Sequence, residues 1–128
     1  MAQGSGSSAR LGVLLGILLY LLAAKPIFAA EYKVGDTAGW TYNVENWPNG
    51  KSFKDADLLI FNYFKERHNV AVLTKEGYDS CTAPSGSIVY QTGHDEIRLD
   101  PGQSYFICTT PGHCENGMKI AINASDSN

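Results

Sequence analysis

The chain has 128 residues, with 13 acidic and 10 basic side chains and a formal net charge of −3. A chain of this length forms one small domain, and it lacks the basic excess that nucleic-acid binding requires. Three histidines are too few for a multinuclear copper site, which needs many. Nucleic-acid-binding proteins and multinuclear copper enzymes are therefore excluded as classes.

The first 29 residues are predicted to be a secretory signal peptide. Arg10 precedes an apolar stretch, residues 11–24, that is shorter than the roughly 20 residues needed to span a bilayer. We expect cleavage after Ala29, because cleavage after Ala30 would place bulky Phe28 at the third position before the cut. Residues 30–128 would then form a secreted domain in an oxidising extracellular compartment, where disulfides persist.

The predicted secreted domain is acidic. Loss of Arg10 and Lys25 with the leader leaves eight basic residues against thirteen acidic ones, a net charge of −5. We therefore expect a basic partner surface, if any, and neither nucleic acid nor an anionic membrane. The last residues, ASDSN, lack the hydrophobic tail of a GPI signal, so we expect a monomer without a membrane anchor after cleavage. Asn123 lies in a sequon and is a candidate N-glycosylation site.

From residue 31 onward the chain reads as short strands separated by turns. The segments are rich in β-branched and aromatic residues, and several alternate between apolar and polar residues. They are residues 31–34, 40–44, 58–64, 69–73, 87–91, 96–99, 104–109 and 118–123. This spacing predicts an all-β Greek-key sandwich or barrel. We expect one or two short helical turns, within residues 52–59 and 73–80.

One segment near the C-terminus, YFICTTPGHCENGMKI, carries a set of metal-binding side chains. Cys108, His113 and Met118 recur at intervals of five residues. Thiolate, imidazole and thioether ligands select copper over calcium, magnesium or manganese. His68, which follows the apolar run 58–64, is the candidate second imidazole. Together they predict one copper ion held by Cys-His-His with a weak axial methionine, the arrangement of blue-copper centres.

Other interpretations of these residues are weaker. Zinc accepts cysteine and histidine, but methionine is not among its usual protein ligands. A cysteine hydrolase needs a third group to orient its histidine, and a dithiol oxidoreductase needs a Cys-x-x-Cys pair; the sequence offers neither. A single copper ion whose ligand positions are filled has no position for a substrate, so we expect no enzyme activity.

The cysteine count agrees with a thiolate ligand. Three cysteines in a secreted chain leave one over, and if Cys108 binds metal, Cys81 and Cys114 remain for a disulfide. Pairing Cys108 with Cys114 would instead close a very small loop and leave Cys81 free. A Cys81–Cys114 bridge would tie the neighbour of His113 to the segment that follows His68.

These motifs resemble the plant phytocyanins, and among them the plantacyanin and chemocyanin types. The resemblance covers the whole predicted secreted domain, including YKVGDTAGWTY, NWPNGKSF, the LLIFNY-to-HNV segment, YDSC and YFICTTPGHCENGMKI. It implies a cupredoxin-like Greek-key β-sandwich with one type 1 copper ion. The implied ligands are His68, Cys108, His113 and Met118. The implied disulfide joins Cys81 and Cys114.

The sequence departs from the family in two respects. Plantacyanins are typically basic, whereas the predicted secreted domain is acidic. The family commonly has Gly-Asp before its LxFxY strand, where this chain has Ala56-Asp57. If residue 56 needs a positive φ, alanine there costs on the order of 1 kcal/mol.

The resemblance implies a single-electron carrier in the plant extracellular space, the apoplast or cell wall, with an unknown redox or cell-wall partner. The alternative is an extracellular signalling or cell-wall interaction protein of the chemocyanin type, acting in pollen-tube guidance or reproduction. In that alternative the copper ion is structural or incidental.

Overall fold

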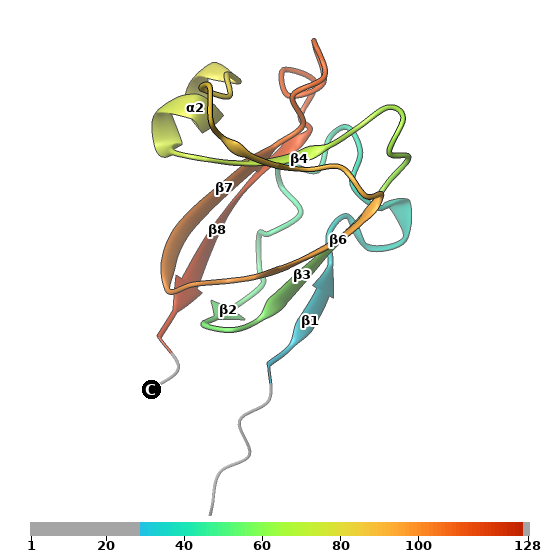
Figure 1. The fold of residues 1–128 in the computed structure, drawn as a ribbon. Helices are drawn as coiled ribbons and strands as arrows, with labels where there is room; N and C mark the ends of the chain where they lie inside the picture. The colour runs from blue at the N-terminus through green and yellow to red at the C-terminus, as the bar shows by residue number, and fades with distance from the viewer. Residues whose placement is uncertain (1–28, 127–128) are drawn as a thin grey trace, which may run out of the picture.

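The structure, a computed structural model, describes residues 29–126, which form two β-sheets packed face to face (Figure 1). One sheet has the strand order β1-β3-β6, and the other has the order β2-β8-β7-β4-β5. The strands of the first sheet are β1 (Glu31–Lys33), β3 (Leu58–Asn62) and β6 (His94–Arg98). Those of the second are β2 (Phe53–Lys54), β8 (Lys119–Ser125), β7 (Gly102–Ile107), β4 (Val70–Leu73) and β5 (Ile88–Tyr90). The predicted signal peptide lies outside the described residues, apart from Ala29.

The β7–β8 hairpin forms the centre of the larger sheet. It pairs antiparallel from Gly102 opposite Ala124 to Ile107 opposite Lys119. Along β8 buried and more exposed residues alternate, because successive side chains of a strand point to opposite faces. The burial of Ile120, Ile122 and Ala124 therefore follows from the alternating pattern in the sequence.

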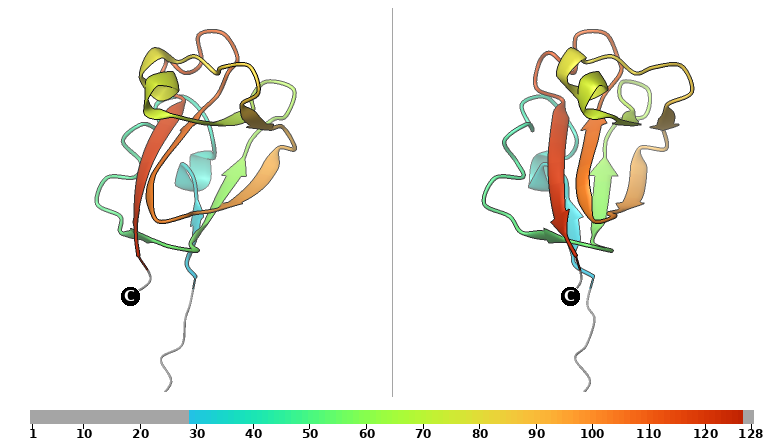
Figure 2. Two further views of the ribbon diagram at one scale, coloured as in Figure 1. Left: turned by 60° about the vertical axis from the view of Figure 1, so that its left-hand side comes forward. Right: turned by 90° about the vertical axis from the view of Figure 1, so that its left-hand side faces the viewer.

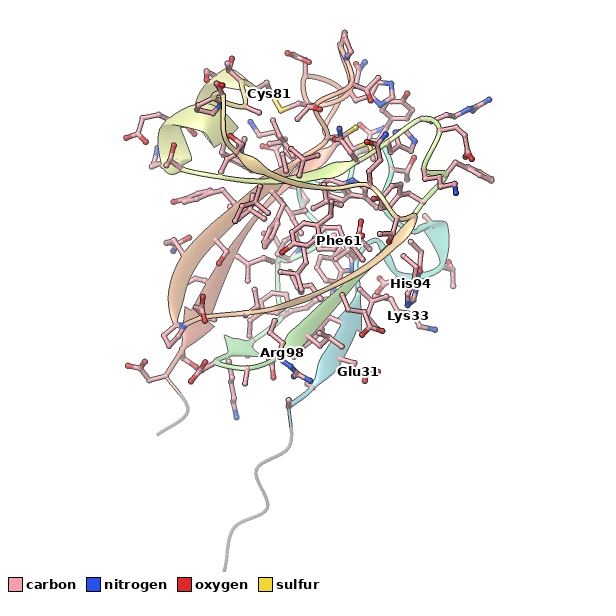
Figure 3. All side chains as sticks on the ribbon, viewed as in Figure 1. Glu31, Lys33, Phe61, Cys81, His94 and Arg98 are labelled. Atoms are coloured by element: carbon pink, nitrogen blue, oxygen red, sulfur yellow. A yellow bond between two sulfur atoms is a disulfide. The ribbon has the colours of Figure 1, made fainter. Side chains whose placement is uncertain are left out.

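The core lies between the two sheets. Phe61 projects from β3 into this space, as Figure 3 shows, and meets Trp40 edge-on at 5.1 Å and Phe106 of β7 at 5.4 Å between ring centroids. All three rings are buried. Burial of such aromatic side chains supplies a large share of the hydrophobic stabilisation of a small domain.

The structure differs from the predicted secondary structure in three details. Residues 40–44 form turns and not a strand. Residues 52–59 hold β2, a turn and the start of β3 in place of a helical turn, and the sequence did not indicate the short 3₁₀ helix η1 (Asp36–Ala38). Asn43 has a φ of 59°, and the N–H groups of Asn43 and Val44 donate to loop carbonyls at Asn116 and Gly117, so no strand pairing is available to them.

The second predicted helical turn is confirmed. Helix α2 (Lys75–Ser80) begins at Thr74, whose hydroxyl accepts from the N–H of Gly77, as a helix N-cap does. It ends at Cys81, which is left-handed and forms a disulfide with Cys114, 33 residues further along the chain. Figure 3 labels Cys81 at the end of the sandwich where α2 lies. The disulfide therefore joins the helix to the loop between β7 and β8.

Among residues 29–126, no helix has the length and apolar composition to cross a bilayer. The first and last described residues lie together at the end of the sandwich opposite to α2, as both views of Figure 2 show.

Ala56 gives a test of backbone strain. Its φ is 70°, in the turn between β2 and β3, so the position that is commonly glycine in the family does need a positive φ. We expect Ala56→Gly to raise the free energy of unfolding by about 0.5–1 kcal/mol, since relief of the left-handed strain exceeds the added entropy of the unfolded chain. Ala38→Gly, at an exposed residue of η1 without a positive φ, should lower it. Urea denaturation of both variants checks this; equal effects would contradict it.

The disulfide gives a second test. Replacing Cys81 and Cys114 together by alanine should lower the free energy of unfolding of the copper-free protein by about 2–5 kcal/mol, because the bridge restricts the unfolded chain. Alanine avoids burying a hydroxyl at Cys114, which is 2% exposed. The measurement is chemical denaturation followed by tryptophan fluorescence. An unchanged midpoint would show that the bridge does not stabilise the fold.

Candidate metal centre

Three of the four predicted ligands lie at or near the ends of strands, and the fourth lies in a loop. His68 precedes β4, Cys108 directly follows β7, and Met118 directly precedes β8. His113 lies in the loop between β7 and β8. Because β4, β7 and β8 are neighbours in one sheet, all four residues meet at one end of the sandwich.

Backbone hydrogen bonds close the loop that carries three of the four residues. The N–H of Cys108 donates to the carbonyl of Met118 at 3.1 Å, which extends the β7–β8 pairing by one step. The N–H of Met118 donates in turn to the carbonyl of His113, also at 3.1 Å. Gly112 and Gly117 both have positive φ values, which let the chain turn sharply on either side of His113. The interval of five residues between Cys108, His113 and Met118 therefore belongs to a loop that these backbone hydrogen bonds close.

The structure brings His68, Cys108 and His113 together. The Nδ1 atoms of His68 and His113 lie 3.9 and 3.6 Å from the Cys108 Sγ, and 2.9 Å from each other. Metal bonds of ~2.0 Å to imidazole and ~2.3 Å to thiolate, as for zinc, put trigonal ligand atoms about 3.5–3.7 Å apart. The three donors therefore fit one transition-metal ion after small shifts, and their softness fits copper.

Burial of these side chains favours metal binding. Cys108 and Met118 are fully buried and His68 nearly so, while His113 is partly exposed. Burial, with smaller contributions from His113 and Arg67, lowers the pKa of His68 below its ordinary value of 6.5. A lowered pKa favours the neutral imidazole, which is the form that binds metal.

Met118, the predicted axial ligand, is fully buried. It belongs to the same buried cluster as Cys108, and its backbone is bonded to both Cys108 and His113. Its thioether therefore has no access to water. Its role as a ligand remains a prediction.

Asn69, which the sequence did not single out, braces the site. Its side-chain oxygen accepts from the N–H of Thr109 at 2.8 Å, and its amide donates to the Thr109 hydroxyl at 2.6 Å. Asn69 follows His68, and Thr109 follows Cys108, so these bonds fix the distance between two ligand-bearing segments. The available signal was a short amide directly after a predicted ligand, a residue type that readily bonds backbone groups.

Tyr42 is the second residue that sequence reasoning missed. Its hydroxyl lies 3.0 Å from Nε2 of His113, and its ring packs edge-on against both histidine rings. With Nδ1 of His113 turned to Cys108, this contact occupies the outer nitrogen of the imidazole. The sequence predicts a strand at residues 40–44, which gives Tyr42 no place at the site; these residues cover the ligand loop instead.

The exposed edge of His113 opens onto a depression of about 450 Å³. Its lining includes Tyr42, Glu66 and Arg67, and so combines an aromatic ring with both charges. The third histidine, His94, is exposed at the start of β6 and contacts Asn62, away from this site. Asn123, the candidate glycosylation residue, is exposed on β8, where its use stays a prediction.

Comparisons with known proteins agree with the fold. Residues 36–118 match the family model of the plastocyanin-like domain. The chain is 54% identical to the basic blue protein of Cucumis sativus, over 74% of this chain and 99% of that protein. It is 46% identical to the chemocyanin of Lilium longiflorum, over 98% of this chain and 100% of that protein.

Solved structures give the same answer. Cucumber basic protein, a blue copper protein, superposes with a TM-score of 0.73 at 54% identity, over 74% of this chain and 99% of that one. Cucumber stellacyanin superposes with a TM-score of 0.70 at 34% identity, over 79% and 100%. These matches confirm the predicted cupredoxin-like sandwich. Since the family model spans more than half of the chain and the relatives align over nearly their full lengths, the chain belongs to the plastocyanin-like family, among the phytocyanins.

Proposed function

We propose that this protein binds one copper ion through His68, Cys108, His113 and Met118 and carries single electrons. The observation that supports this most directly is the convergence of two imidazoles and one buried thiol, with ligand atoms within 4.8 Å of one another. Blue copper proteins among the relatives support the choice of metal.

The residues divide the work of such a site. Copper, when bound, supplies a one-electron change between Cu(II) and Cu(I). Cys108 and Met118 offer soft sulfur, which suits Cu(I), and the two imidazoles suit Cu(II) as well. The β7–β8 pairing, Asn69 and the disulfide hold these side chains in place, so little needs to move when the charge changes. His113 is the most exposed of the four, and its edge is the route by which electrons reach a partner.

We propose no catalytic step for this chain, because four ligands leave no position for a substrate. Secretion as a monomer, with residues 1–29 removed, is the setting that the sequence supports. The acidic charge of residues 30–128 supports a basic redox or cell-wall partner.

A second function is favoured by one observation, the match to lily chemocyanin over essentially the full length of both chains. Under this alternative the domain acts as an extracellular signal, and the copper ion is structural or incidental. A Cys108→Ser protein separates the two functions. Loss of biological activity in a variant that still folds supports electron transfer, whereas full activity of the copper-free protein supports signalling.

Cys108 provides the test of the copper site. The purified protein should take up one Cu(II) and turn blue through sulfur-to-copper charge transfer, and Cys108→Ser should abolish the colour. His94→Gln is the matched control, since His94 lies outside the site and its loss should leave colour and stoichiometry intact. Visible absorption and metal analysis check both. A Cys108→Ser protein that stays blue contradicts the assignment.

Met118 tests the tuning of the site. Met118→Gln should keep copper and colour but lower the reduction potential, because an amide oxygen stabilises Cu(I) less well than a thioether does. Met118→Leu, which keeps the apolar volume and removes the sulfur donor, should raise the potential instead. Cyclic voltammetry measures both. Two potentials equal to that of the parent protein would assign Met118 to core packing alone.

A further inference from the structure

A buried carboxylate lies at the end of the sandwich opposite to the ligands. Asp57 is 3% exposed, yet no cationic side chain pairs with it; the ion pairs recorded within residues 29–126 are Lys75–Asp79 and His94–Glu96. One carboxylate oxygen accepts from the N–H of Lys54 at 2.9 Å, and the other accepts from the N–H of Ala30 at 2.9 Å. A buried charge is costly unless it is paired. The lack of a counter-charge beside Asp57 therefore needs an explanation.

The guanidinium of Arg98 has a different recorded partner. Arg98, which Figure 3 labels at the same end of the sandwich as Glu31, donates to the backbone carbonyl of Ala56 at 2.9 Å. Of the two backbone nitrogens that donate to Asp57, the one that can gain a charge is therefore that of Ala30.

Ala30 is held from both sides. Its N–H donates to the side chain of Asp57, and its carbonyl accepts from the N–H of Leu58 at 2.8 Å. This is the step that begins the parallel pairing of β1 with β3, where Glu31 lies opposite Leu58. Ala30 thus belongs to the folded domain, and its nitrogen points at a carboxylate.

We propose that cleavage between Ala29 and Ala30 creates the missing counter-charge. Hydrolysis of this peptide bond consumes one water molecule, leaves the carboxylate on Ala29 and frees the amine of Ala30. An α-amine has a pKa of about 7.7–8.0 when unperturbed, so at pH 6 it carries a proton. Removal of the leader therefore replaces the hydrogen bond from the neutral Ala30 N–H with an ammonium–carboxylate pair. This ion pair lies directly before the start of β1.

Only one cleavage position yields this ion pair. A cut one residue later, after Ala30, would remove both backbone groups that Asp57 and Leu58 bind. A cut one residue earlier would leave the Ala30 nitrogen as an uncharged amide. Only a chain that begins at Ala30 places its terminal ammonium within hydrogen-bond distance of Asp57.

The first experiment reads the N-terminus of the protein secreted from the full chain in plant cells, by mass spectrometry. The expected first residue is Ala30, and a protein that begins at Glu31 overturns the proposal. The second compares two purified forms, residues 30–128 and residues 29–128, each with Asp57 and with Asp57→Asn, at pH 6. The form with Ala29 keeps the Ala30 N–H but moves the ammonium away.

With Asp57, the form that begins at Ala30 should have a folding equilibrium constant about fivefold higher, since hydrogen bonds to charged groups are worth roughly twice neutral ones. With Asp57→Asn the two forms should be equally stable. A difference that survives Asp57→Asn, or no difference with Asp57, overturns the ion pair.

Acetylation of the Ala30 amine keeps the comparison informative if Asp57→Asn does not fold. The acetylated protein retains an N–H at the same position and loses the charge. It should therefore match the form that begins at Ala29. An acetylated protein as stable as the free amine contradicts the proposal. None of these outcomes depends on copper, so they are separate from tests of the proposed function.

Discussion

The hydrogen bond from Cys108 to Met118 is the constraint on which the metal centre depends. It continues the β7–β8 pairing into the loop, so the register of the six residue pairs between these strands determines which residues face one another where the loop begins. A shift of one residue would turn every side chain of one strand to the other face and would move a sulfur donor out of the core. The central hairpin therefore both supports the sandwich and sets the ligand geometry.

The other contacts around the site act from outside this loop. Asn69 links it to the start of β4, the disulfide links Cys114 to the end of α2, and Tyr42 closes over His113. Each contact comes from a different part of the chain. A ligand set held from three directions loses little freedom when a metal binds, and this pre-organisation reduces the rearrangement that accompanies a change of charge.

Local signals allowed the sequence to predict the cluster of His68, Cys108 and His113, the disulfide and most strands. Alternation along residues 118–123 reflects burial on one face, and the odd cysteine separates Cys108 from the bridged pair. Residues 40–44 could not be predicted in the same way. Their aromatic and β-branched residues suit a strand, but their backbone partners are loop carbonyls at Asn116 and Gly117, more than 70 positions away, which no local pattern contains. The two-residue strand β2 likewise exists only because β8 lies beside it.

The opposite end of the sandwich shows how a weak element can be supported. Strand β1 has three residues and pairs with β3 in parallel, a pairing slightly less stable than the antiparallel kind. The turn that leads into β3 carries strain at Ala56, whose φ is positive. Asp57 lies directly after this turn, and its carboxylate binds both the turn, at Lys54, and the start of β1, at Ala30. The strained turn and the short strand are therefore held by the same buried side chain, so a charge gained at Ala30 would strengthen both.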